Sequence, residues 1–123
     1  LGLGSIGTST LRLMLSALPH PQQLSFCDIY SKRSQLETLL AEIRSGLHYR
    51  GPAAILESRK EAPAEIYQSR VIVGATNVTD LLDIAKLQPG TIIIDDSAPH
   101  CFRTEDAFAR LDKQGDILFT EGG

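Results

Sequence analysis

The sequence contains no apolar run that approaches the roughly 20 residues of a membrane-spanning helix. It has no excess of basic residues either: 12 Lys and Arg face 15 Asp and Glu, for a net charge of -3. That balance argues against nucleic acid or a membrane surface as a partner. The two cysteines, Cys27 and Cys101, do not have metal-site spacing, and two cysteines are too few for a disulfide framework. We therefore expect a cytoplasmic protein without a metal site.

No internal repeat, linker or low-complexity segment divides the 123 residues, which make one domain at most. Two features of the ends are also missing. No initiator methionine and no apolar strand precede Gly2, and the last residues, 121–123, come one residue after an apolar run at 117–119. No signal peptide is visible, although the missing start makes this inconclusive. We expect the chain to be a piece of a longer protein and its sheet to have a gap where the first strand belongs.

What the sequence does have, at its very start, is a complete G-x-G-x-x-G motif formed by Gly2, Gly4 and Gly7. In a dinucleotide-binding turn, the first glycine permits the tight bend and the second lets the pyrophosphate approach the backbone. The third lets the following helix pack closely on the sheet, and the helix N-terminus offers free N–H groups to the phosphates. The loop residues predicted to bind the cofactor are Gly2, Gly4, Ser5, Ile6 and Gly7.

The pattern downstream alternates strands with helices. Helical periodicity is seen over residues 8–18, 33–45, 79–87 and 104–113, with a short helix expected within 58–69. Strand-like runs cover residues 24–29, 53–56, 70–75, 91–95 and 116–120. Continuous apolar strands indicate burial on both faces, and intervening helices indicate parallel crossovers. The prediction is an α/β fold, a doubly wound parallel sheet of the Rossmann type, with the first strand largely missing and strand order 3-2-1-4-5-6.

Ligands of such sheets bind beyond the carboxyl ends of the strands, so the residues there are the site candidates. Asp28 ends the strand at 24–29, where a carboxylate can accept hydrogen bonds from the adenosine ribose and repel the extra phosphate of NADP. Lys32 and Arg33 follow and could instead hold that phosphate, or could be solvated residues at a helix start. NAD is the favoured cofactor and NADP stays open. Since the two cations are adjacent on a helix, at most one is expected to turn toward the ribose.

Two more strand ends carry candidates. Ala75, Thr76 and Asn77 follow the strand at 70–75, where small residues would let the backbone approach the nicotinamide ribose, or would form a plain turn. Asp96 and His100 lie in the polar stretch after the most apolar strand. There His100 could move a proton while Asp96 orients it, and nearby Cys101 could act as a nucleophile only with a lowered pKa. The alternative is a capped turn with His100 exposed and Cys101 buried.

The opening glycines, the segment 71–77, the segment 87–96 and the residues 121–123 together resemble one group of proteins. The chain looks like the NAD(P)-binding domain of the group that includes shikimate dehydrogenase, glutamyl-tRNA reductase and the long-chain acyl-acyl-carrier-protein reductases. The resemblance implies that a late glycine pair lies near the nicotinamide. This chain departs from the group after the second strand, where the group often has an Asn-Arg-Thr or Ala-Arg pattern suited to NADP.

Two functions are compatible with these residues. The first is the NAD(P)-binding domain of an oxidoreductase, a dehydrogenase or reductase, which positions the nicotinamide for hydride transfer. Its substrate, a small molecule or a thioester, would be held by a domain outside this sequence. The second is a non-catalytic module that senses a nucleotide. The assignment of a reaction rests on the site residues and partly on analogy, because one fold supports many functions.

Overall fold

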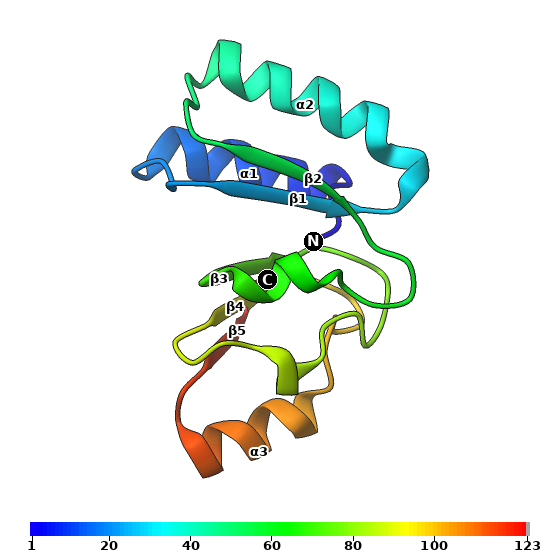
Figure 1. The fold of residues 1–123 in the computed structure, drawn as a ribbon, viewed down its shortest axis with the longest axis vertical. Helices are drawn as coiled ribbons and strands as arrows, with labels where there is room; N and C mark the ends of the chain where they lie inside the picture. Colours follow the sequence, from blue (N-terminus) through cyan, green and yellow to red (C-terminus); the bar gives the residue numbers. More distant parts are fainter. Residues whose placement is uncertain (123) are drawn as a thin grey trace.

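The computed structural model describes residues 1–122 of the chain (Figure 1). Three α-helices and five strands alternate along most of it. The helices are α1 (Ser5–Ala17), α2 (Arg33–Gly46) and α3 (Thr104–Gln114). The strands are β1 (Leu24–Asp28), β2 (Ala53–Glu57), β3 (Val71–Gly74), β4 (Ile92–Asp95) and β5 (Leu118–Glu121). Single-turn helices are η1 (Tyr30–Lys32), η2 (Ala64–Gln68) and η3 (Ile84–Lys86).

All five strands are parallel, but they form two small sheets. β1 pairs with β2, and the second sheet has the order β3-β4-β5. Both sheets lie between helices, with α2 beyond the first and α3 beyond the second (Figure 1). The predicted α/β class with parallel strands is confirmed. β1 and β3 face each other across a gap.

Leu1 and Gly2 cross this gap and bond to both sheets. The Leu1 amine donates to the Val73 carbonyl at 2.8 Å, and the Leu1 carbonyl accepts from the Ala75 N–H at 2.8 Å. On the other side, the Gly2 N–H donates to the Cys27 carbonyl at 2.9 Å. Leu1 and Gly2 therefore lie where the last residues of a strand between β1 and β3 would lie.

The apolar core is divided in the same way as the sheets. One cluster joins α1, α2 and β1 through residues such as Leu15, Phe26 and Ile43. The larger cluster surrounds β3 and β4 and includes Ile72 and Ile93. In β3 and β4 only alternate residues are fully buried: Ile72 and Ile93 are buried, whereas Val71 and Ile92 are exposed, so the predicted burial on both faces is wrong for these two strands. The helices over residues 8–18, 33–45 and 104–113 and the short helix within 58–69 are all found, with small shifts of their ends.

The predicted helix over residues 79–87 is wrong. Asp80 adopts a left-handed conformation with φ of 53°, which interrupts a right-handed helix. Leu82 instead forms an isolated parallel bridge with Phe102. Only the single turn η3 follows, begun by Asp83, whose carboxylate accepts from the Ala85 N–H at 2.9 Å. The apolar residues that suggested helical spacing are buried. They lie in a loop and pack into the larger core cluster.

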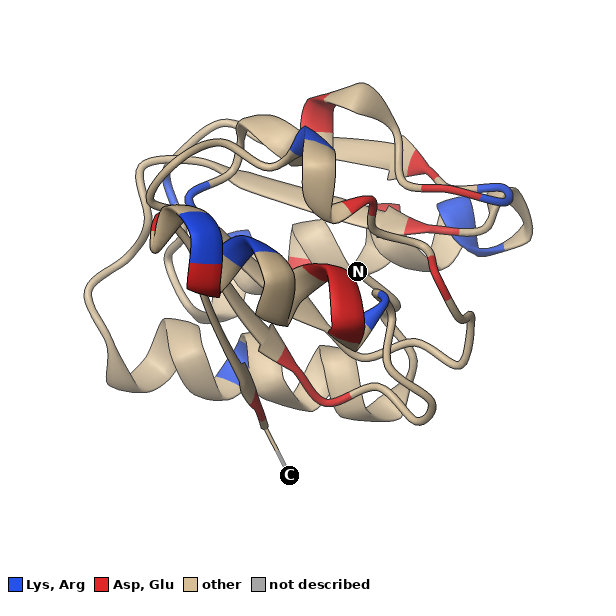
Figure 2. Ribbon diagram, turned by 90° about the horizontal axis from the view of Figure 1, so that it is seen from below, with Lys and Arg blue, Asp and Glu red and all other residues tan. Residues whose placement is uncertain are grey.

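The distribution of charge and the lengths of the helices relate to the two classes of partner considered above, nucleic acids and membranes. Acidic and basic positions are interspersed along the ribbon in Figure 2. Within residues 1–122, none of the helices has the length and apolar character needed to cross a membrane.

Candidate nucleotide site at the carboxyl ends of the strands

The glycine motif forms a tight loop between the end of the gap and α1. Gly2 has a φ of 76°, which an L side chain rarely adopts, and a Cβ there would lie 2.5 Å from the Ala75 carbonyl oxygen. A Cβ on Gly7 would collide with the Gly2 carbonyl oxygen. At Gly4 the position of a Cβ is open, with the Lys32 Nζ as its nearest neighbour at 4.0 Å. Gly2 and Gly7 are thus required by the fold, whereas Gly4 leaves space above the loop.

The N-terminus of α1 opens onto that space. Gly4 is the N-cap residue and makes no side-chain cap hydrogen bond. The first intrahelical bond to it runs from the Thr8 N–H to the Gly4 carbonyl at 3.0 Å, so the N–H groups of Ser5, Ile6 and Gly7 precede the helical ladder. Ser5 and Ile6 are exposed. Uncapped N–H groups at the positive end of a 13-residue helix suit an anion such as a phosphate.

Asp28 lies next to the loop, at the end of β1, and is 8% exposed. Its Oδ2 accepts from the Leu3 N–H at 2.6 Å, and its Oδ1 accepts from the Ile29 N–H at 2.8 Å. A carboxylate has about four acceptor positions, so acceptor capacity remains for ribose hydroxyls. The sequence-predicted Asp28 and the glycine loop are therefore in direct contact through Leu3.

The two cations after β1 have different orientations. The Lys32 Nζ lies 3.6 Å from the Asp28 Oδ2, so Lys32 turns back toward the loop. Arg33 instead pairs with Glu37 along α2 at 3.3 Å, and its side chain is 54% exposed. Arg33 therefore fits the alternative of a solvated residue at a helix start, whereas Lys32 lies between Gly4 and Asp28.

The turn after β3 packs against the loop and continues toward the next strand end. The Thr76 N–H donates to the Ser97 Oγ at 3.0 Å, and the Thr76 Oγ1 accepts from the Val78 N–H at 3.1 Å. Ala75 touches the position of Gly2, as described above, while Asn77 is exposed. The structure thus brings Ala75 and Thr76 beside the glycine loop, and Ser97 connects them to the segment after β4.

The carboxylate that contacts His100 is Asp95 and not Asp96, which corrects the predicted pair. The His100 Nδ1 lies 2.9 Å from the Asp95 Oδ2, and its Nε2 lies 3.2 Å from the Glu121 Oε1. Asp95 is 2% exposed and ends β4. Side chains alternate along a strand, so Asp96 points to the other face, where its Cβ lies 3.2 Å from a Cβ placed on Gly122. Asp96 therefore cannot be assigned the orienting role.

Asp95 is held as a carboxylate by its neighbours. Burial alone would raise the pKa of Asp95, but hydrogen bonds from Ser97, His100 and Cys101 outweigh it and lower this pKa below its ordinary value. Cys101 shows the opposite effect: burial, together with the nearby Asp95 charge, raises the pKa of its thiol to about 12. Cys101 is thus a buried thiol with a raised pKa, the opposite of the lowered pKa that a nucleophilic role would require.

Sequence reasoning missed Asp95 and Glu121 as partners of His100, and Ser97 as a partner of Asp95. Asp95 could have been chosen by strand parity, because it shares the buried face of Ile93, two residues earlier. Glu121 pairs in register with Asp95 across β4 and β5, which required the sheet order. Of the late glycine pair, Gly122 is placed beside Asp96, and Gly123 lies outside the described residues. Comparisons with protein-family models, curated proteins and solved structures found no match to the chain.

Proposed function

We propose that the chain is a dinucleotide-binding domain of the doubly wound type and belongs to an NAD(P)-dependent dehydrogenase or reductase. The carrying observation is the pairing of an open, uncapped helix N-terminus at Gly4 with a buried carboxylate, Asp28, on the adjacent strand end. The first suits a pyrophosphate and the second suits ribose hydroxyls. The order β2-β1, then the gap, then β3-β4-β5 is compatible with the expected 3-2-1-4-5-6.

The residues fit a dinucleotide at each part of the site. The N–H groups of Ser5 and Ile6 would face the pyrophosphate, and Asp28 would face the adenosine ribose. The turn at Ala75 and Thr76 would face the nicotinamide ribose. When bound, the nicotinamide would supply or accept a hydride, and a substrate outside this chain, a small molecule or a thioester, would be its partner.

His100 favours an oxidoreductase over a nucleotide sensor. Its Nδ1 is held by the buried Asp95, and its Nε2 is the nitrogen that faces the exposed Glu121. An imidazole oriented through one nitrogen can exchange a proton through the other, which carbonyl–alcohol interconversion requires. A sensor that only binds the nucleotide has no need of such an arrangement.

Cofactor choice depends on Asp28 and Lys32. The 2′-phosphate of NADP would bring about two negative charges beside Asp28, and a tenfold discrimination needs only about 1.4 kcal/mol. Lys32 offsets part of this repulsion because it already lies 3.6 Å from Asp28. We propose a preference for NAD. Asp28→Ala should gain relative affinity for NADPH. Lys32→Gln should weaken NADPH more than NADH, whereas Arg33→Gln, the matched control, should change neither.

The binding site is tested by titration calorimetry of the chain with NADH. Gly4→Val places a branched side chain in the space above the loop, where its Cβ would have no neighbour closer than the Lys32 Nζ at 4.0 Å, so it should abolish binding while the protein stays folded. Gly46→Ala is the control, because a Cβ there meets nothing within 4 Å at the end of α2. Unchanged NADH affinity in Gly4→Val, with a native circular dichroism spectrum, would reject the site.

A further inference from the structure

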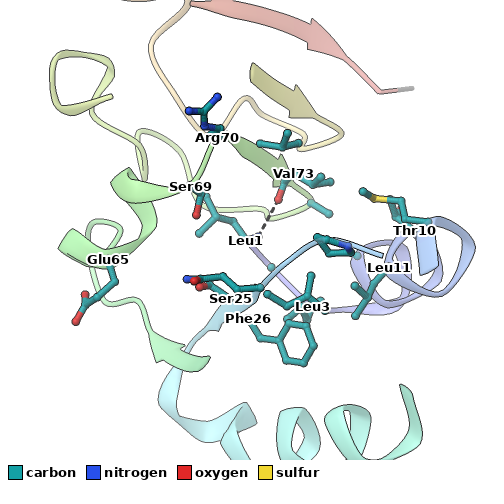
Figure 3. Close-up of a pocket in the computed structure, with 18 of the residues that line it drawn as sticks. Leu1, Leu3, Thr10, Leu11, Ser25, Phe26, Glu65, Ser69, Arg70 and Val73 are labelled. Atoms are coloured by element: carbon teal, nitrogen blue, oxygen red, sulfur yellow. Dashed lines mark hydrogen bonds between the residues drawn. The ribbon is translucent and has the colours of Figure 1, made fainter. Parts of the chain in front are cut away.

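Two regions beside the strands differ in chemistry. A cavity of about 560 Å³ lies between β1 and β3, and many of the side chains around it, such as Leu11, Phe26 and Val73, are apolar (Figure 3). The carboxyl ends of β4 and β5 instead place two carboxylates on either side of the His100 ring. A polar group of a ligand is better accommodated by this second region, because polar groups that leave water need partners.

The two carboxylates, Asp95 and Glu121, lie side by side on adjacent strands. They are partners in the parallel register of β4 and β5, so their side chains leave the sheet on the same face. Asp95 is 2% exposed, whereas the side chain of Glu121 is 77% exposed. Like charges at such neighbouring positions repel each other. A positive charge between them would offset the repulsion, and the His100 ring occupies that place.

The His100 ring can donate to both carboxylates in one protonation state only. Its Nδ1 lies 2.9 Å from the Asp95 Oδ2, and its Nε2 lies 3.2 Å from the Glu121 Oε1. A carboxylate only accepts hydrogen bonds, and a neutral imidazole has a single N–H. A neutral ring with its N–H toward Asp95 would present a lone pair to Glu121. The contact with Glu121 therefore belongs to the doubly protonated ring.

The other groups around the ring add no charge. The Phe102 ring lies 5.9 Å from the His100 ring, measured between centroids. The neighbouring Cys101 thiol stays uncharged near neutral pH, because burial raises its pKa to about 12. Within residues 1–122, the charged groups that contact the ring are thus Asp95 from β4 and Glu121 from β5.

Glu121 can leave His100 without any change in the sheet. Its backbone is paired with Asp95, and the next residue, Gly122, donates its N–H to the Asp95 carbonyl at 2.9 Å. A rotation of the exposed Glu121 side chain is therefore enough to uncover the His100 Nε2. Ion pairs between exposed groups are weak, so a competing ligand atom can replace this one.

We infer that Glu121 is a protonation-dependent plug on the Nε2 of His100. While the ring is doubly protonated, the Glu121 carboxylate occupies the position that an oxygen atom of a ligand must take to accept the Nε2 proton. Once that proton has passed to the ligand oxygen or to water, the attraction ends, and the Asp95 charge repels Glu121 from the neutral ring. A carbonyl oxygen must then displace Glu121, whereas an alcohol that approaches the neutral ring meets an open position.

This regulation rests on the proposed function for the identity of the ligand, but the contact itself needs no nucleotide. The test therefore uses the nucleotide-free, full 123-residue chain and diethyl pyrocarbonate as the probe. This reagent transfers an ethoxycarbonyl group to an accessible, unprotonated imidazole nitrogen and releases ethanol and CO₂. Mass spectrometry of peptides gives the rate for each histidine, and the exposed His48 is the internal standard.

Two variants that each remove one exposed glutamate are compared with wild type. Glu121→Ala removes the plug, and Glu37→Ala is the matched control, because Glu37 pairs with Arg33 on α2 and not with a histidine. A native circular dichroism spectrum is required of both. At pH 6, Glu121→Ala should speed acylation of His100 relative to His48 by about twofold to fivefold, the factor that an exposed ion pair of up to about 1 kcal/mol allows.

The pH dependence distinguishes a plug from simple crowding. At pH 8.5 the ratio between Glu121→Ala and wild type should fall toward one, because the neutral ring no longer holds Glu121. Equal His100 rates at pH 6 would overturn the inference. An acceleration that is the same at pH 8.5, or that Glu37→Ala shares, would also overturn it. Calorimetry with NADH is a separate measurement: its failure would reject the nucleotide site and leave the acylation difference in place.

Discussion

Asp95 is the most informative single position in the site, and Asp95→Asn tests its role with almost no change of shape. The carboxylate is 2% exposed and accepts from the Ser97 N–H at 3.2 Å, the His100 Nδ1 at 2.9 Å and the Cys101 N–H at 3.2 Å. An amide can accept through its oxygen only, so at least one of these donors would face an N–H group. Charge-assisted bonds are about twice as strong as neutral ones.

The expected loss is about 2 kcal/mol in the free energy of unfolding, because a buried donor left without its acceptor costs roughly 1–3 kcal/mol. For a domain of this size that is a fall in Tm of about 8 °C. Asp96→Asn is the matched control. It changes the same group one residue along, on the half-buried opposite face, and should alter stability by less than about 0.5 kcal/mol. Urea unfolding of both variants measures the difference.

The pH dependence gives a second readout of the same variant. The folded pKa of Asp95 lies below its ordinary value of 3.8, so its contribution is fully present above that value. It is lost as the pH falls through the folded pKa. The stability difference between wild type and Asp95→Asn should therefore shrink at acid pH. Equal losses for Asp95→Asn and Asp96→Asn, or a difference that does not change with pH, would refute the assignment.

Three other expectations concern the rest of the fold. Arg110→Ala should lower the free energy of unfolding in urea by about 2 kcal/mol, because the Arg110 side chain is 10% exposed and donates to the Asp116 carboxylate at 2.9 and 2.8 Å. Arg12→Ala is the control: the Arg12 side chain is 54% exposed, and its loss should cost under about 0.5 kcal/mol. Ile43→Ala should cost about 3 kcal/mol, since Ile43 is 1% exposed; a loss below about 1 kcal/mol would contradict the packing. Burial lowers the pKa of the Leu1 amine below 8.0, against weaker opposing charges including Asp28, so stability should rise with pH up to about 8. N-terminal acetylation should abolish that rise, and a pH profile that acetylation leaves unchanged would contradict it.

Most strands could be predicted because each is a short continuous apolar run, as in Ile92–Asp95, although only alternate residues of that strand are fully buried. The same signal failed over residues 79–87, where apolar side chains cover a core without forming a helix. Local spacing does not reveal the left-handed Asp80 or the bridge from Leu82 to Phe102, since these depend on tertiary contacts.

The glycine loop and Asp28 could be found from the sequence because their spacing is set by one loop–helix–strand unit, the glycine loop followed by α1 and β1. The partners of His100 could not, because Asp95 and Glu121 meet it through the pairing of β4 with β5. The difference between Asp95 and Asp96 is one residue, and in a strand one residue exchanges the buried face for the other. Which of two adjacent acidic residues at a strand end is buried can therefore be predicted only from the alternation of side chains along the preceding strand.

The central claim is that the loop between Gly2 and Gly7 binds a dinucleotide. Its most direct test is NMR chemical-shift mapping of the ¹⁵N-labelled 13.4 kDa chain titrated with NADH. Binding at this loop should give saturable shifts of the Ser5, Ile6 and Gly7 amides and of residues around Asp28, with the Gly4→Val variant unresponsive. Saturable shifts centred away from the loop, or none at millimolar NADH in a folded sample, would contradict it.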